Sequence, residues 1–176
     1  MPELPEVETI IRDLKKSQFR NNRITDIQVD WPKSVKTHSV EDFKDELTGV
    51  EFTGFKRRAK YLIFNLSIDK TLILHLRMSG KLIFHQNGTA AGKHDQVVFS
   101  FANGGQLHFN DTRKFGRLYL TDEPETILGK LGPEPLDGEF KLAEFRKKLK
   151  SRSRMIKSLL LDQSFIAGLG NIYTDE

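Results

Sequence analysis

The sequence contains no cysteine, which excludes disulfide bonds and every zinc site that uses cysteine ligands. It also lacks any apolar run approaching the ~20 residues that a membrane-spanning helix requires. No segment of the kind that forms a secretory signal peptide precedes the first expected helix. From these absences we expect a cytoplasmic protein that does not insert into a membrane.

Positive charge is only slightly in excess, with 28 Lys and Arg against 24 Asp and Glu and a formal net charge of +4. Such a small excess predicts nucleic-acid binding poorly. The placement of the charges is more informative, because Arg and Lys concentrate in residues 56–60 and 141–157. With 176 residues, the chain is long enough for one well-packed core or two small domains.

Residues 5–19 have the pattern of an amphipathic helix, with apolar side chains three and four apart at Val7, Ile10, Ile11 and Leu14. Pro5 suits the first turn, and acidic residues near the start and basic residues near the end match the helix dipole. Such a helix, once packed, would hold Pro2 and Glu3 at its exposed start. Glu6 fits a helix cap and a site residue equally well.

Most of residues 50–120 show the alternation of polar and apolar side chains that is typical of strands. An earlier strand is expected at residues 27–31, followed by a helix that Ser39 caps and Gly49 ends. Asn103-Gly104-Gly105 separates two alternating segments and indicates a hairpin. Several short strands at this spacing predict an antiparallel sandwich or barrel.

Residues 121–138 are rich in proline and glycine and predict a linker. After them, apolar residues are spaced as in helices and stand among many lysines and arginines. We therefore predict an α+β protein with a β-rich domain over residues 1–120, a linker over 121–138 and a helical domain over 139–176.

Pro2 and Glu3 together suggest imine chemistry. If Met1 is removed, Pro2 carries a secondary amine, and an α-amino group titrates near pH ~8, so much of it is nucleophilic at neutral pH. Condensation with a sugar aldehyde gives an iminium that keeps its charge, which favours elimination. Glu3 could give or take a proton. Alternatively, Pro2 and Pro5 only stiffen the start of the helix.

We expect Lys60 to open a strand after the basic residues Lys56, Arg57 and Arg58, and such a basic run is usually a solvated surface. Strand alternation nevertheless places Lys60 on the same face as Leu62 and Phe64, which are apolar. A lysine on that face should lie at the rim of the sheet, where it can reach a phosphate or a reacting sugar.

Two expected turns carry candidate site residues. The first contains His75, which is alternatively a buried structural histidine, and Met78, which is alternatively a core filler. The second places Arg113 beside Phe115. An exposed aromatic next to a cation can enter a base stack while the target base is turned out.

Gly168-Leu169-Gly170-Asn171 predicts a turn that a ligand can approach closely. We expect Asn171 to cap a helix that begins at Ile172, whose free N–H groups would form a phosphate site. The alternative is an ordinary corner between two helices. The preceding helix is expected to carry basic residues that neutralise phosphates without reading sequence, namely Arg152, Arg154 and Lys157.

Four stretches of the chain together resemble a known family. In order they are Met1–Thr9, Arg57–Tyr61, Asp111–Gly116 and Gly168–Tyr173. They are similar to bacterial formamidopyrimidine-DNA glycosylases, the Fpg or MutM family, and Leu4 favours this family over its Nei relatives. The resemblance implies an N-terminal antiparallel β-sandwich with an N-terminal helix, followed by the start of a helix–two-turn–helix module.

The activity that this resemblance implies is that of a DNA glycosylase and AP lyase. It would excise oxidised purines such as 8-oxoguanine and formamidopyrimidines and nick the abasic site by β-elimination. Pro2 would attack C1′, Glu3 would donate a proton, and Lys60 would assist elimination and contact DNA. The expected partner is double-stranded DNA containing oxidised bases or abasic sites, and the expected protein is a monomer.

The resemblance also implies a DNA interface, in which residues matching Met78, Arg113 and Phe115 fill the gap left by the extruded base. Lys114 stands where the family commonly has arginine, so the bidentate geometry of a guanidinium is lost. The candidate DNA-binding residues are His75, Met78, His94, Arg113, Phe115, Arg152, Lys157 and Asn171.

The family continues beyond the matching part with a four-cysteine zinc finger, and without cysteines we expect no zinc cofactor in this chain. We therefore expect a truncated or divergent member of the family. If Met1 is retained, the Pro2 nitrogen is an amide and cannot form the iminium. The alternative function is a non-catalytic protein of the same fold that binds damaged DNA.

Overall fold

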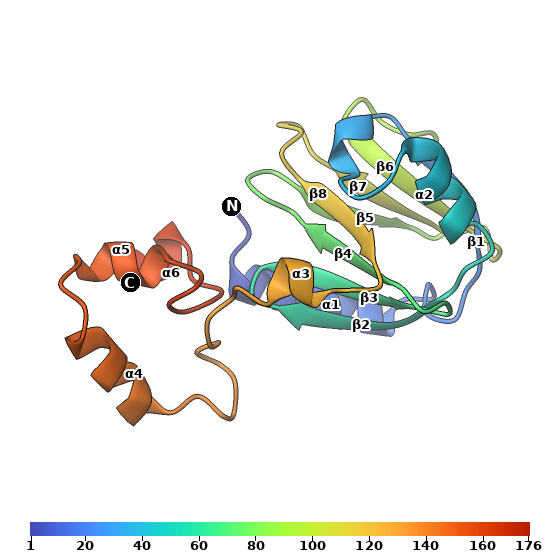
Figure 1. The fold of residues 1–176 in the computed structure, drawn as a ribbon. Coiled ribbons are helices and arrows are strands. Elements are labelled where there is room, and N and C mark those ends of the chain that lie inside the picture. The colour runs from blue at the N-terminus through green and yellow to red at the C-terminus, as the bar shows by residue number, and fades with distance from the viewer.

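Two four-stranded antiparallel sheets form the larger part of the computed structural model, which describes residues 1–176 (Figure 1). One sheet has the order β1-β6-β7-β5 and the other the order β2-β3-β4-β8. The predicted α+β class, with an antiparallel sandwich, is confirmed. The strands are β1 Ile24–Val29, β2 Phe52–Arg58, β3 Tyr61–Leu66, β4 Thr71–His75, β5 Lys81–His85, β6 Asp95–Phe101, β7 Gln106–Asn110 and β8 Arg117–Thr121.

One hydrophobic core of 25 buried side chains lies between the sheets and beneath two helices, α1 Leu4–Lys16 and α2 Val40–Leu47. Strand alternation produces it, because every second side chain of a strand points to the same face. In β3 the inward-facing residues are Leu62, Phe64 and Leu66. Helix α1 adds the face that its apolar spacing predicts, with Val7, Ile11 and Leu14 buried.

Helix α1 ends earlier than the predicted residue 19 and starts one residue sooner. The backbone N–H and the hydroxyl of Ser17 both donate to the Leu14 carbonyl, which ends the helix. Phe19 then turns into the core, where its ring stacks on Phe101 with 4.7 Å between the centroids.

Strand β1 ends at Val29, before the predicted Trp31. The N–H groups of Asp30 and Trp31 both donate to the Gln96 carbonyl, so neither continues the ladder. Pro32 then begins a short 3-10 helix, η1 Pro32–Ser34. The predicted second helix is confirmed, since the Ser39 hydroxyl accepts the Asp42 N–H at 3.1 Å.

The remaining helices follow the sheets and lie to one side of them (Figure 1). They are α4 Leu142–Lys150, α5 Ile156–Leu161 and α6 Asn171–Asp175. Their own small core contains Leu159, Phe165 and Ile166. The expected linker, residues 121–138, contains a helix of its own, α3 Glu125–Leu128. None of the helices combines the length and apolar character that crossing a membrane requires.

Candidate active site and nucleic-acid interface

Glu3 joins the two parts of the molecule. Its side chain is buried, with 1% of the residue exposed, and lies at the start of α6. The carboxylate accepts the N–H groups of Gly170 at 2.5 Å, Ile172 at 2.9 Å and Tyr173 at 3.4 Å. A negative charge is favourable there because the first N–H groups of a helix have no partners within it. A Cβ at Gly170 would lie 2.4 Å from the Glu3 side chain, so only glycine fits.

Two expectations about α6 are therefore wrong. Asn171 is the first residue of the helix and not its cap, and no side chain of the preceding Gly170 can cap it. The N–H groups of Ile172 and Tyr173, expected to be free for a phosphate, are bound by Glu3. The Asn171 side chain itself is exposed.

Glu6 has the role of a cap. Its carboxylate accepts the Glu3 N–H at 2.9 Å, in a capping box at the start of α1. It also accepts the hydroxyl of Tyr173 at 3.1 Å. Glu6 thus strengthens the same junction that Glu3 forms.

Lys60 lies in the two-residue turn between β2 and β3 and does not open a strand as predicted. It is buried, with 5% exposed, as is the nearby Leu62. Burial lowers the pKa of its amine, and the nearby carboxylate of Glu3 partly opposes that shift. None of the intramolecular hydrogen bonds or ion pairs involves this amine, so it is available for proton transfer beside Glu3.

A buried carboxylate from the linker fixes this turn. Glu134, 7% exposed, accepts the backbone N–H of Ala59 at 2.5 Å. It also accepts guanidinium N–H groups of Arg57 at 2.5 Å and Arg58 at 3.0 Å. Ala59 has a positive φ of 51°, a conformation that costs energy for a residue with a Cβ. Glu134 therefore holds the strained turn that presents Lys60.

Met1 and two expected DNA-contacting residues line one surface cavity of about 330 Å³. Met78 and Phe115 are each 44% exposed, so Met78 is not a core filler. The Arg113 guanidinium lies over the Phe115 ring, 4.7 Å from its centroid. The turn that carries Met78 and the turn that carries Arg113 and Phe115 therefore lie next to Met1. Together they present apolar and cationic side chains.

His75 is buried, with 8% exposed, at the end of β4. Its Nδ1 accepts the N–H of Arg77 at 3.0 Å, so the ring stabilises the turn that follows. Burial, with the positive charges of Arg77 and Lys60, lowers the pKa of His75 to about 3. The buried structural histidine is the alternative that this environment favours.

His94 is half-buried, and its carbonyl accepts the N–H of Asp111 at 2.8 Å.

The basic residues of the helical part are placed differently from the prediction. Arg152 and Arg154 lie in the loop between α4 and α5, because α4 ends at Lys150. Lys157 lies on α5, and its amine pairs with Asp175 at the end of α6. Arg152 is exposed and has no ion pair.

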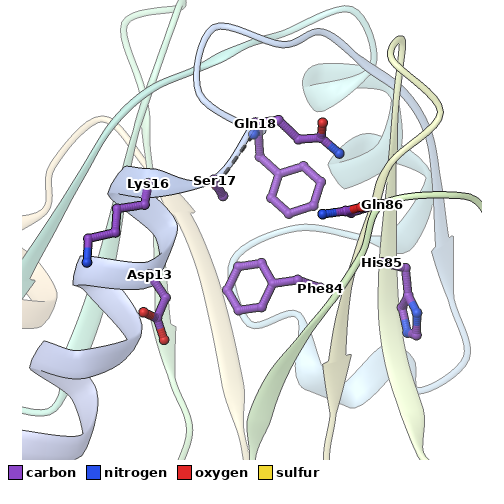
Figure 2. Close-up of a pocket in the computed structure, with 8 residues that line it drawn as sticks. Asp13, Lys16, Ser17, Gln18, Phe84, His85 and Gln86 are labelled. Atoms are coloured by element: carbon purple, nitrogen blue, oxygen red, sulfur yellow. Dashed lines mark hydrogen bonds between the residues drawn. The ribbon is translucent and has the colours of Figure 1, made fainter.

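A larger cavity, of about 410 Å³, lies at the other end of α1 (Figure 2). Asp13 and Lys16 from the helix line it together with Phe84 and His85 of β5 and the following Gln86. None of the predicted site residues lines it.

No group of three or more His, Asp or Glu side chains in the chain could hold a metal ion, so no residue here fits a zinc site.

The two-sheet body and the helical part correspond to the two domains of a class of DNA glycosylase. The model of the formamidopyrimidine-DNA glycosylase N-terminal domain matches residues 1–118. The model of the formamidopyrimidine-DNA glycosylase H2TH domain matches residues 131–176. The chain belongs to the formamidopyrimidine-DNA glycosylase family.

Curated relatives agree with this assignment. The chain is 48% identical over its whole length to formamidopyrimidine-DNA glycosylase of Protochlamydia amoebophila and covers 64% of that protein. It is 43% identical to the enzyme of Desulfitobacterium hafniense, of which it covers 65%. The chain thus spans slightly less than two thirds of the length of these relatives.

Solved structures of Lactococcus lactis Fpg (MutM) have the same fold. A complex with DNA containing an N7-benzyl-Fapy-dG is 44% identical, with a TM-score of 0.91 over 99% of this chain and 65% of that chain. A complex with DNA containing an abasic site is also 44% identical, with a TM-score of 0.90 over 99% of this chain and 65% of that chain.

Sequence reasoning missed Glu134 and Asp111 as residues that hold the site. Both are buried carboxylates whose partners are mainly backbone N–H groups or distant arginines. Asp111 is the first residue of a stretch that the family resemblance matches, which was the only signal in the sequence. Glu134 lies among the prolines of the expected linker, where a buried charge was not expected.

Proposed function

We propose that the protein containing this chain is a DNA glycosylase and AP lyase that excises oxidised purines from duplex DNA. The observation that carries the proposal is the juxtaposition of Glu3 and Lys60 at the start of the chain. Glu3 is fixed by three backbone N–H groups, and Lys60 is buried nearby with a lowered pKa and no partner of its own. A carboxyl group and an amine whose pKa is lowered by burial therefore stand next to Pro2.

Removal of Met1 would turn the Pro2 nitrogen from an amide into a secondary amine. Its lone pair would form a bond to C1′ of the damaged nucleotide as the bond from C1′ to the base breaks, and the base would leave with a proton. The nitrogen would then lose its proton, and its lone pair would open the sugar ring by breaking the C1′–O4′ bond, with O4′ taking up a proton. The iminium formed in this way would withdraw electrons from the sugar. Loss of a C2′ proton would then let the C3′–O bond break and release the phosphate. Glu3 and Lys60 would carry protons in these steps.

On the DNA side, Met78, Arg113 and Phe115 would occupy the gap that the extruded base leaves. Their exposure and the stacking of Arg113 on Phe115 support this role. The remaining candidate contacts are His75, His94, Arg152, Lys157 and Asn171. Their roles are proposals, and the pairing of Lys157 with Asp175 means that DNA would have to compete for its amine.

We further propose that the protein acts as a cytoplasmic monomer. We assign residues 1–120 to the catalytic sandwich, 121–138 to the linker and 139–176 to part of the helix–two-turn–helix domain. Zinc, if the protein uses it, would be bound outside these residues.

Borohydride trapping on DNA with an abasic site tests the reaction, because only an iminium is reduced to a stable bond between protein and DNA. Protein without Met1 should give a trapped adduct, and Pro2→Gly, which keeps a primary amine, should retain part of it. The control is the same protein acetylated at its N-terminal amine, which should give none. Trapping by the acetylated protein would make Lys60 or another lysine the nucleophile. If the Met1-free protein gave no adduct, the proposed reaction would be refuted. The alternative, a non-catalytic protein of the same fold that binds damaged DNA, would then remain.

A further inference from the structure

The two exposed hydrophobic side chains at the DNA-facing cavity are presented in the same way. Met78 follows Arg77, which has a φ of 58°, and Phe115 follows Lys114, which has a φ of 59°. Neither preceding residue is a glycine, so each turn holds a strained conformation that the surroundings must impose. Strain of this kind, repeated at both positions, indicates that the directions of Met78 and Phe115 are fixed before DNA arrives.

One buried carboxylate joins the two turns. Asp111, with 0% exposed, accepts the N–H of Gly116 at 2.7 Å through Oδ2. Its Oδ1 accepts the hydroxyl of Ser79, which belongs to the Met78 turn, and the N–H of Arg113 at 3.2 Å. The Arg113 N–H also donates to the Ser79 hydroxyl oxygen at 3.1 Å. The Met78 turn and the Arg113–Phe115 turn are thus connected through a single pair of side chains.

The carboxylate itself cannot shift easily. The backbone of Asp111 bonds to the His94 carbonyl at 2.8 Å, and its own carbonyl accepts the Gln96 amide at 2.9 Å. On the other side, a Cβ at Gly116 would lie 2.2 Å from the Phe109 ring and 3.2 Å from Asp111 Oδ2. The Arg113–Phe115 turn therefore ends at a glycine that packs closely against both the core residue Phe109 and the Asp111 carboxylate.

We propose that Asp111 and Ser79 are positioning residues that hold the two turns as one rigid unit, so that Met78 and Phe115 enter an opened duplex together. This inference rests on the proposed function, because it concerns the residues that would replace an extruded base. Its physical basis is preorganisation: side chains that are already ordered lose less entropy on binding than side chains on independent loops. This gain in binding free energy is expected only on DNA whose base stack is opened, because only there do Met78 and Phe115 enter the duplex.

Ser79 offers the cleaner test, because it is partly exposed and its loss leaves the core intact. We expect Ser79→Ala to lower the preference for a duplex with a tetrahydrofuran abasic analogue over an undamaged duplex by about 3- to 30-fold, a range typical of coupled neighbouring residues. Ser79→Thr keeps the hydroxyl and should restore the preference. The control is Ser17→Ala, which removes a comparable local hydrogen bond at the far end of α1. Unchanged preference in Ser79→Ala would overturn the proposal.

The coupling of the two turns is measured by a double-mutant cycle with Met78→Ala and Phe115→Ala. Their effects on binding the tetrahydrofuran duplex should be non-additive in the native chain and additive in the Ser79→Ala background. The same coupling in both backgrounds would mean that the hydroxyl does not connect the turns, and the proposal would be wrong.

Hydrogen exchange in the free protein separates this proposal from the proposed function. If the hydroxyl and the carboxylate connect the turns, Ser79→Ala should speed exchange at both Arg113 and Gly116, whereas Ser17→Ala should not. Unchanged exchange at both amides would refute the connection whatever the protein does with DNA. Faster exchange, in a protein whose native form shows no preference for the abasic analogue, would support the connection and refute the glycosylase function.

Discussion

Replacing Glu3 by Gln should loosen the junction between the sheets and α6 without changing the shape of the side chain. The carboxylate receives three backbone N–H groups, whereas a Gln amide has one oxygen to accept them and an NH2 group that would face a donor. The loss of one hydrogen bond to a charged acceptor costs about 1.5–3 kcal/mol. We therefore expect the amides of Gly170, Ile172 and Tyr173 to exchange about 10- to 150-fold faster.

Residue-resolved hydrogen exchange of the free protein is the assay, with amides of β3 and β4 as internal references. The matched control is Glu41→Gln, which removes one negative charge from an exposed position on α2. It should leave all of these amides unchanged. Equal protection of Gly170, Ile172 and Tyr173 in native and Glu3→Gln protein would show that the charge of Glu3 does not hold α6, and the reasoning from the helix start would fail.

Three further outcomes are expected. Because the pKa of His75 is lowered to about 3 in the folded state, the unfolded state binds its proton more readily between about pH 3 and 6.5. The free energy of unfolding should therefore fall as pH falls through that window, by up to ~1.4 kcal/mol per pH unit, and chemical denaturation should show a smaller fall in His75→Gln. Phe115→Ala should weaken binding to a lesion duplex by roughly 1–3 kcal/mol and to undamaged duplex much less, in titrations at one salt concentration; equal losses would assign Phe115 to the fold. Glu134→Ala leaves two guanidinium groups without their shared carboxylate and should lower the free energy of unfolding by about 3–5 kcal/mol in urea, against little change for Glu144→Ala on the exposed surface of α4.

Local patterns predicted the elements well. The alternation in β3 and the helical spacing of Val7, Ile11 and Leu14 involve only residues close together in the sequence. Such local patterns can therefore predict a strand and a helix without a structure. The ends of elements were predicted less well, as at Ser17, where a side-chain hydrogen bond to the Leu14 carbonyl decided the boundary. The number and spacing of the strands predicted a sandwich or a barrel, and the family resemblance favoured the sandwich.

The contacts that build the candidate site could not be predicted in the same way. Glu3 and Gly170 are 167 positions apart, and nothing in either segment indicates that one caps the other. Lys60 was expected on a strand, but its position in a strained turn depends on Glu134, 75 residues from Ala59. Hydrogen bonds over such separations are determined by the packing of the two parts, which local periodicity does not encode.

The position of Met1 has a practical consequence for anyone who produces this protein. Met1 lines the same cavity as Met78 and Phe115, and the next residues are held in place, with the Leu4 N–H bonded to the Gly168 carbonyl at 3.1 Å. A purification tag placed ahead of Met1 would therefore start inside the surface that we propose for DNA, and it would also keep the Pro2 nitrogen acylated. A tag at the opposite end of the chain, or one whose cleavage leaves Pro2 as the first residue, avoids both effects.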